Sequence, residues 1–197
     1  MKQTGIPFTE ETITLDQPET REILTKKSPA GLVPFLTHQS GSDEITVWDT
    51  LAIAEYLNEQ FPEKQLWPED KKARAFARSI SAEMHSGFAA LRTMWPMQFV
   101  REGLRHLTTG GVQKDVDRIN TIWTDCRKNF GETAKDVGPF LFGRFSIADA
   151  MFAPVVSRLV TYGPVALSRE ASTYRDMMHG LPVMSEWGDG AHAELDR

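Results

Sequence analysis

Two neighbouring stretches of the chain hold residue types suited to binding a small, peptide-like anion. SPAGLVPFL, residues 28–36, places Pro34 at the start of a short apolar segment, and VWDTLAIAEYL, residues 47–57, places Asp49 and Thr50 at the start of an amphipathic segment. An amino-acid end group carries an ammonium and a carboxylate on neighbouring atoms. An acidic residue beside a helix N-terminus matches both charges, so these stretches form the candidate binding site.

The bond between Val33 and Pro34 has two interpretations. Proline has no N–H and is tolerated at the start of a strand, so Pro34 can be an ordinary edge-strand proline. An X–Pro bond also adopts the cis form at modest cost. A cis bond would turn the N–H and C=O of Val33 outward, where an extended ligand could pair with them as an added strand does.

The Asp49-Thr50 pair also has two interpretations. Thr50 stands where the predicted helix starts, so its hydroxyl can cap free N–H groups, and simple capping explains most such pairs. In the second interpretation the helix start attracts a ligand carboxylate while Asp49 receives a ligand ammonium.

The surrounding pattern predicts a small α/β domain. Ile13 and Leu15 alternate with threonines, which indicates a strand over residues 12–15. Residues 33–36 and 45–47 predict two further strands, joined as a hairpin by a polar segment that contains Gly41. Residues 50–60 predict a helix that ends before Pro62.

Beyond residues 66–70 (LWPED) the apolar period becomes helical almost throughout, which predicts domains over 1–66 and 71–197. One long helix is predicted to end at Pro96, and others to begin at Ser146, near Ser168 and after Pro182. The apolar faces of the first two long helices are Ala73, Ala77, Ile80, Met84, Phe88, Leu91 and Trp95, then Val112, Val116, Ile119, Trp123, Cys126 and Phe130.

GRFSIADA, residues 143–150, has the pattern of a helix capping box. Ser146 is predicted to accept from the N–H of Asp149, while the Asp149 carboxylate reaches back to the N–H of Ser146. We therefore interpret Asp149 as a residue that supports folding and not catalysis.

Together these motifs resemble the cytosolic glutathione transferase family, bacterial type, over almost the whole chain. The resemblance implies a thioredoxin-like domain followed by a helical bundle, with Pro34 as a cis-proline. It implies that Val33 pairs with the cysteinyl part of glutathione and that Asp49 and Thr50 hold its γ-glutamyl end. Leu32 stands where many relatives have a polar residue near the glycyl end, and leucine cannot pair with a carboxylate.

The resemblance begins partway into the family's thioredoxin-like domain. The first strand and most of the first helix of that domain have no counterpart in this sequence, and at average element lengths they amount to roughly 20 residues. The family's thiol-activating Ser, Tyr or Cys follows that strand, so no catalytic residue is identifiable here. Ser28 and Tyr56 carry hydroxyls, but Ser28 begins a Ser-Pro turn and Tyr56 fits the apolar face of its helix. We expect the printed start to be an internal Met of a longer enzyme, and a catalytically dead chain is the alternative.

The resemblance implies that glutathione is a co-substrate whose thiolate attacks a small hydrophobic electrophile, as in detoxification, and that the protein is a homodimer. A glutathione-dependent isomerase of the maleylacetoacetate type would use the same site. A non-catalytic glutathione-binding module is the third hypothesis.

Composition excludes several other classes. The net charge of −5 and the lack of a long basic run argue against nucleic-acid binding. No apolar segment approaches the roughly 20 residues that span a bilayer. The single cysteine, Cys126, allows no internal disulfide, which fits a cytoplasmic location and a core position. No metal site is expected, because the five histidines lack ligand spacing: His38, His85, His106, His179 and His192.

Overall fold

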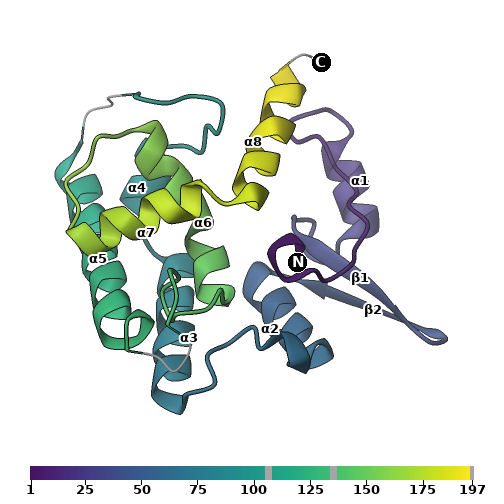
Figure 1. Ribbon diagram of the computed structural model, residues 1–197. Helices are drawn as coiled ribbons and strands as arrows, with labels where there is room; N and C mark the ends of the chain where they lie inside the picture. The colour runs from purple at the N-terminus through teal and green to yellow at the C-terminus, as the bar shows by residue number, and fades with distance from the viewer. Residues whose placement is uncertain (105–107, 134–136, 196–197) are drawn as a thin grey trace. The chain divides into compact units, whose positions relative to one another are not determined.

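The computed structural model describes residues 1–104, 108–133 and 137–195 (Figure 1). The chain divides into two compact units, Met1–Gln65 and Leu66–Arg197. The first unit combines a two-stranded sheet with helices, and the second is helical throughout its described elements. The predicted fold class, an α/β part followed by an all-α part, is confirmed.

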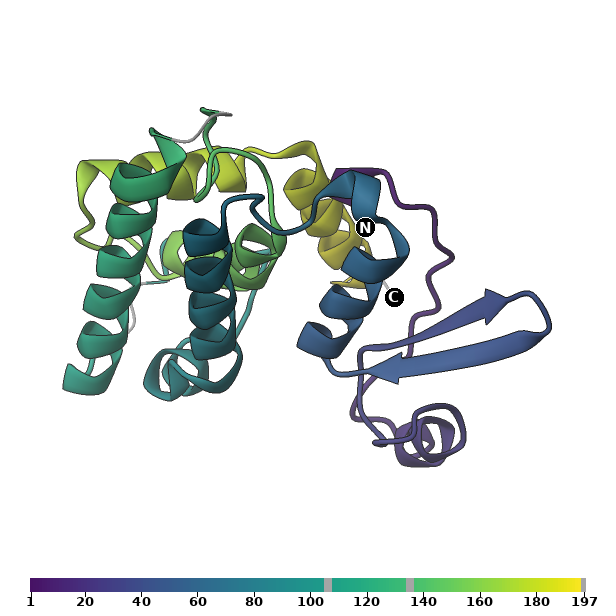
Figure 2. The ribbon, with the colours of Figure 1, turned by 90° about the horizontal axis from the view of Figure 1, so that it is seen from below.

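The first unit is built around an antiparallel hairpin. Strands β1 (Phe35–Ser40) and β2 (Asp43–Trp48) pair in a register that runs from Phe35 opposite Trp48 to Ser40 opposite Asp43. Figure 2 shows the second strand of the hairpin leading directly into the next helix. The remaining elements of this unit are η1 (Lys2–Thr4), α1 (Thr20–Lys27), α2 (Thr50–Gln60) and η2 (Pro62–Lys64).

The predicted strand over residues 12–15 is wrong. In the described part of the chain, β1 and β2 pair only with each other, so this segment has no neighbouring strand to complete its hydrogen bonds. It is tied to a helix instead: the Thr20 hydroxyl donates to the carbonyl of Thr14 at 2.7 Å and accepts from the N–H of Gln17 at 3.0 Å. Helix α1, which starts at Thr20, was not predicted from the sequence.

The second unit packs its helices around α6 (Ile147–Thr161), of whose 15 residues ten are buried. Trp95, Trp123, Phe152 and Tyr174 are among its largest fully buried side chains. The other elements are α3 (Lys71–Ser86), α4 (Ala89–Met94), α5 (Gly110–Cys126), the π-helical η3 (Arg127–Gly131), α7 (Arg169–His179) and α8 (Pro182–Leu195).

The single long helix predicted to end at Pro96 is two helices, because the backbone breaks between Ser86 and Ala89. A Cβ on Gly87 would lie 2.5 Å from the carbonyl oxygen of Glu83, and Phe88 adopts a left-handed conformation (φ 54°). The side chain of Phe88 supplies no cap for α4, and the Asp115 carboxylate of α5 accepts instead from the Leu91 N–H at 2.9 Å.

The apolar period nevertheless identified the buried positions. The residues predicted for the inner face of the first helix are all buried on both sides of the break, as Ala77, Leu91 and Trp95 illustrate. Cys126 is fully buried as well, and burial raises the pKa of its thiol far above the ordinary range. The apolar period therefore predicted the buried positions correctly but did not predict the break in the helix.

Ser146 and Asp149 form a capping box at the start of α6. The buried Asp149 carboxylate accepts from the Ser146 N–H at 2.8 Å and from its hydroxyl at 3.0 Å. The other carboxylate oxygen accepts from the Leu141 N–H at 3.0 Å and from the Tyr174 hydroxyl at 3.1 Å. One carboxylate thus joins the helix start, the loop before it and α7.

Burial raises the pKa of Asp149 to about 6, although its hydrogen bonds act in the opposite direction. The folded state therefore holds this proton more tightly than the unfolded chain does. The resulting stabilisation is fully present below the unfolded pKa of 3.8 and is lost as the pH rises through about 6.

We predict that the stability advantage of the wild type over Asp149→Asn is larger at pH 4.5 than at pH 7.5, by on the order of 2 kcal/mol. Asparagine cannot titrate, so the difference between the two proteins isolates this group. Urea denaturation at both pH values measures it. A difference that is independent of pH, or that grows toward pH 7.5, would contradict the assignment.

Candidate functional site

The hairpin register brings the two predicted site stretches to one end of the sheet. Phe35 and Trp48 are opposite each other, Pro34 directly precedes Phe35, and Asp49 directly follows Trp48. Opposed Cα atoms in an antiparallel pair lie about 4.5–5.5 Å apart, so Pro34 and Asp49 stand side by side at the open end of the hairpin. The Val33–Pro34 peptide bond is cis, as the family resemblance implies. The four predicted site residues therefore gather in one place.

Val33 presents its backbone at this end. Its N–H and C=O have no hydrogen-bond partner among the described residues, and 44% of the residue is exposed. Leu32 beside it is 67% exposed and offers no polar side chain. An extended ligand could therefore pair with the Val33 backbone without displacing an existing bond.

A buried serine, whose role the sequence did not reveal, holds the loop that leads to Val33. The Ser28 hydroxyl donates to the carbonyl of Leu32 at 2.7 Å and accepts from the Leu32 N–H at 3.2 Å. The Ser28 carbonyl also accepts from the N–H of Gly31, whose positive φ of 65° suits glycine. The hydroxyl is thus used to fix the loop.

The cap of α2 differs from the prediction. Asp49, not Thr50, is the N-cap residue, and its Oδ1 accepts from the N–H groups of Leu51 at 2.9 Å and Ala52 at 3.4 Å. Thr50 is already the first helical residue, whereas a capping side chain must stand on the non-helical residue before the helix. Asp49 meets that requirement with φ 73° and ψ 132°.

Thr50 keeps polar groups available at the helix start. It is exposed, and its N–H and hydroxyl have no partner in the parts of the chain that the structure describes. The first N–H groups of a helix carry a partial positive charge. The open end of the hairpin therefore combines an acidic side chain, a helix N-terminus and an extended backbone segment.

Tyr56, further along α2, contacts the sheet through its side chain. Its hydroxyl lies 2.5 Å from Nδ1 of His38 on β1, and the two rings meet edge to face. This contact fastens α2 to the sheet. The sequence predicted only that Tyr56 belongs to the apolar side of the helix.

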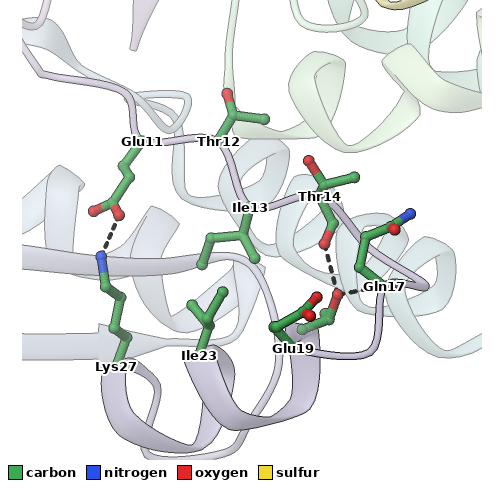
Figure 3. Close-up of a pocket in the computed structure, with 9 residues that line it drawn as sticks. Glu11, Thr12, Ile13, Thr14, Gln17, Glu19, Ile23 and Lys27 are labelled. Atoms are coloured by element: carbon green, nitrogen blue, oxygen red, sulfur yellow. Dashed lines mark hydrogen bonds and ion pairs between the residues drawn. The ribbon is translucent and has the colours of Figure 1, made fainter. Parts of the chain in front are cut away.

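A separate open pocket of about 420 Å³ lies between the segment before α1 and that helix (Figure 3). Lys27 forms an ion pair with Glu11 at its wall. None of Val33, Pro34, Asp49 and Thr50 lines it; its lining residues are Glu11, Thr12, Ile13, Thr14, Gln17, Glu19, Thr20, Ile23 and Lys27. This pocket is therefore distinct from the predicted site.

Among the described residues, no group of three or more His, Cys, Asp and Glu side chains is arranged to hold a metal ion. His106 lies outside the described residues. Within the described helices, none is both long and apolar enough to cross a membrane.

Two domain models match the chain. The N-terminal domain of glutathione S-transferase matches residues 1–60, and the C-terminal domain of glutathione S-transferase matches residues 75–187. The chain belongs to the glutathione S-transferase family. Its first unit is the thioredoxin-like part and its second unit is the helical part of that fold.

Curated relatives match shorter stretches. Glutathione S-transferase 1 of Dianthus caryophyllus is 34% identical over 79 residues, 40% of this chain and 34% of the relative. A probable maleylacetoacetate isomerase of Caenorhabditis elegans is 31% identical over 98 residues, 50% of this chain and 44% of the relative. The chain thus spans less than half the length of each of these two relatives.

A solved structure supports the fold over nearly the full chain. The glutathione transferase homolog from Burkholderia strain BGR1, crystallised with bound glutathione, superposes with a TM-score of 0.64 at 24% identity. The match covers 98% of this chain and 87% of that protein.

We predict that Ser28→Ala loosens the loop before Val33, because it removes both bonds to Leu32. The expected loss of unfolding free energy is about 1–2 kcal/mol, and the Leu32 amide should exchange its hydrogen faster. Thr25→Ala, which removes an exposed hydroxyl bond to the Arg21 carbonyl, is the control and should change stability by less than about 0.5 kcal/mol. Equal effects of the two substitutions would contradict the role of the Ser28 hydroxyl in holding this loop.

Proposed function

We propose that the open end of hairpin β1–β2 binds glutathione and that the protein conjugates its thiolate to small hydrophobic electrophiles. The observation that carries the proposal is the register, because pairing Phe35 with Trp48 places the Val33–Pro34 bond beside the Asp49–Thr50 helix start. Family membership supports the choice of ligand.

Each part of the site has one role in this proposal. The unpartnered N–H and C=O of Val33 pair with the cysteinyl backbone of glutathione, and Pro34 sets the direction of that backbone. Thr50 and the start of α2 receive the carboxylate of the γ-glutamyl end. Asp49 receives its ammonium, while the same carboxylate caps the helix. Because the Leu32 side chain cannot pair with a carboxylate, the glycyl end gains nothing from it.

The reaction needs the thiolate of glutathione. A free thiol has a pKa near 8.5, so only a minority is ionised at neutral pH. The thiolate sulfur forms a bond to the electrophilic carbon, and the leaving group departs with the electron pair of the broken bond. We assign the activation of the thiol to no residue of this chain.

A second candidate is glutathione-dependent isomerisation of a maleylacetoacetate-type substrate. The 31% identity to a probable maleylacetoacetate isomerase favours it. Conjugation of a chromogenic chloronitroarene and isomerisation of maleylacetoacetate, assayed on the same preparation, separate the two activities. Glutathione binding without either activity would favour a non-catalytic binding module.

We predict that Asp49→Ala weakens glutathione binding by at least tenfold, because it removes the charge that receives the ammonium. Asp70→Ala is the matched control, since Asp70 is also an exposed N-cap residue and accepts from the Ala73 N–H at 2.8 Å. Both substitutions should cost about 1 kcal/mol of stability as lost caps. Titration calorimetry measures the affinity, and unchanged affinity in Asp49→Ala would reject this role.

We also propose, from family membership alone, a cytoplasmic homodimer. Light scattering on the purified chain should give twice the monomer mass of 22.2 kDa. A monomer at micromolar concentration would reject the dimer.

A further inference from the structure

The open pocket of the first unit lies where residues 11–14 pass over helix α1 (Figure 3). Two contacts at opposite ends of the pocket hold this segment. At one end Lys27 forms an ion pair with Glu11, and at the other end the Thr20 hydroxyl donates to the carbonyl of Thr14. The space of about 420 Å³ between these contacts is within the range typical of ligand sites.

The centre of the pocket is apolar. Figure 3 shows Ile13 of the segment and Ile23 of α1 pointing toward each other, and 39% of Ile23 is exposed. Thr20, Ile23 and Lys27 share one face of α1, because helical residues three or four positions apart are neighbours. This face of the helix is partly uncovered, whereas Leu24 on another face is buried.

The segment over α1 has strand-forming residues but no partner strand. Thr12, Ile13 and Thr14 are all β-branched, a residue type that favours strands. Their backbone N–H groups have no hydrogen-bond partner among the described residues. Unpaired backbone groups of this kind can pair with an added extended chain, in which the backbone supplies the hydrogen bonds and alternate side chains supply the specificity.

The charges of the pocket favour a ligand with a positive group. Among the lining residues Lys27 is the only base, and it is already paired with Glu11. No ion pair engages Glu19 within the described chain. Figure 3 shows Glu19 near the Thr14 end of the pocket, away from the pair between Lys27 and Glu11. A cationic side chain of a ligand can therefore form a charge-assisted bond at this end.

We propose that this pocket binds an extended segment of a partner protein that carries an aliphatic side chain two residues from a basic one. The partner pairs through its backbone with residues 12–14, which then form a strand. Residues two positions apart in a strand lie on the same face, so the aliphatic side chain enters between Ile13 and Ile23 while the basic one reaches Glu19. The pocket contains none of the residues proposed to hold glutathione, so this surface is additional to the proposed function.

The test uses a capped pentapeptide, acetyl-Thr-Lys-Thr-Val-Thr-amide, without glutathione. The amide chemical shifts of Thr12, Ile13 and Thr14 in ¹⁵N-labelled protein should change and saturate, and these amides should exchange their hydrogens about threefold or more slowly in the complex. A peptide methylated on its three central backbone nitrogens loses those donors and should bind about fivefold or more weakly. A peptide with norleucine in place of lysine should bind about threefold or more weakly, because it lacks the charge.

Two pairs of variants test the side chains. Ile23→Ala should weaken binding of the lysine peptide about fivefold, because it removes part of the apolar centre. Ile45→Ala is the matched control, since Ile45 of β2 is 37% exposed and does not line the pocket. Glu19→Gln should weaken binding of the lysine peptide and leave that of the norleucine peptide unchanged. Glu22→Gln removes another carboxylate of α1, outside the pocket, and should change neither.

Three kinds of result would overturn the site. The absence of saturable binding, or chemical-shift changes confined to residues outside the pocket, would reject the location. Equal binding of the methylated peptide would reject the backbone pairing. Unchanged binding in Ile23→Ala or Glu19→Gln, or an equal loss in the matched control, would reject the assigned side chain. Because glutathione is absent from these measurements, none of the results depends on the proposed function.

Discussion

The pairing of Phe35 with Trp48 is the constraint on which the site of the first unit depends. Strand register is all or none, because a slip of one residue turns every side chain of the strand to the other face. This register sets the cis bond before β1 and the helix start after β2 at one end of the hairpin. The contact between His38 and Tyr56 then holds α2 against the sheet that positions it. Backbone pairing thus brings two motifs that are separated along the sequence together as one candidate site.

Helix α6 has the corresponding role in the second unit. The Asp149 carboxylate fixes its start through four hydrogen bonds, and those bonds offset part of the cost of burying a charged group. Near its other end, Arg158 and Tyr162 hold the segment after α4 by donating to the carbonyls of Trp95 and Pro96. One helix therefore orders two segments that are distant in the sequence.

Much of this arrangement could be predicted because its signals are local. A proline at a strand start, the capping-box spacing of Ser146 and Asp149, and the apolar period of α3 and α5 all act over a few residues. Family resemblance supplied the other residues of the candidate site. The features that were predicted wrongly, or not at all, depend on contacts that local sequence patterns do not encode. A strand over residues 12–15 needs a partner strand, and the break at Gly87 leaves the apolar period intact. The bond between Arg158 and Trp95 joins residues 63 positions apart.

The most direct measurement of the central claim is a titration of ¹⁵N-labelled protein with glutathione, followed by the amide chemical shifts. The ligand is expected to pair with the backbone of Val33 and to lie at the start of α2. The amide chemical shifts of Val33, Thr50 and Leu51 should therefore change together and saturate at the same glutathione concentration. Saturable shifts confined to other segments, or no shifts at millimolar glutathione, would contradict the account.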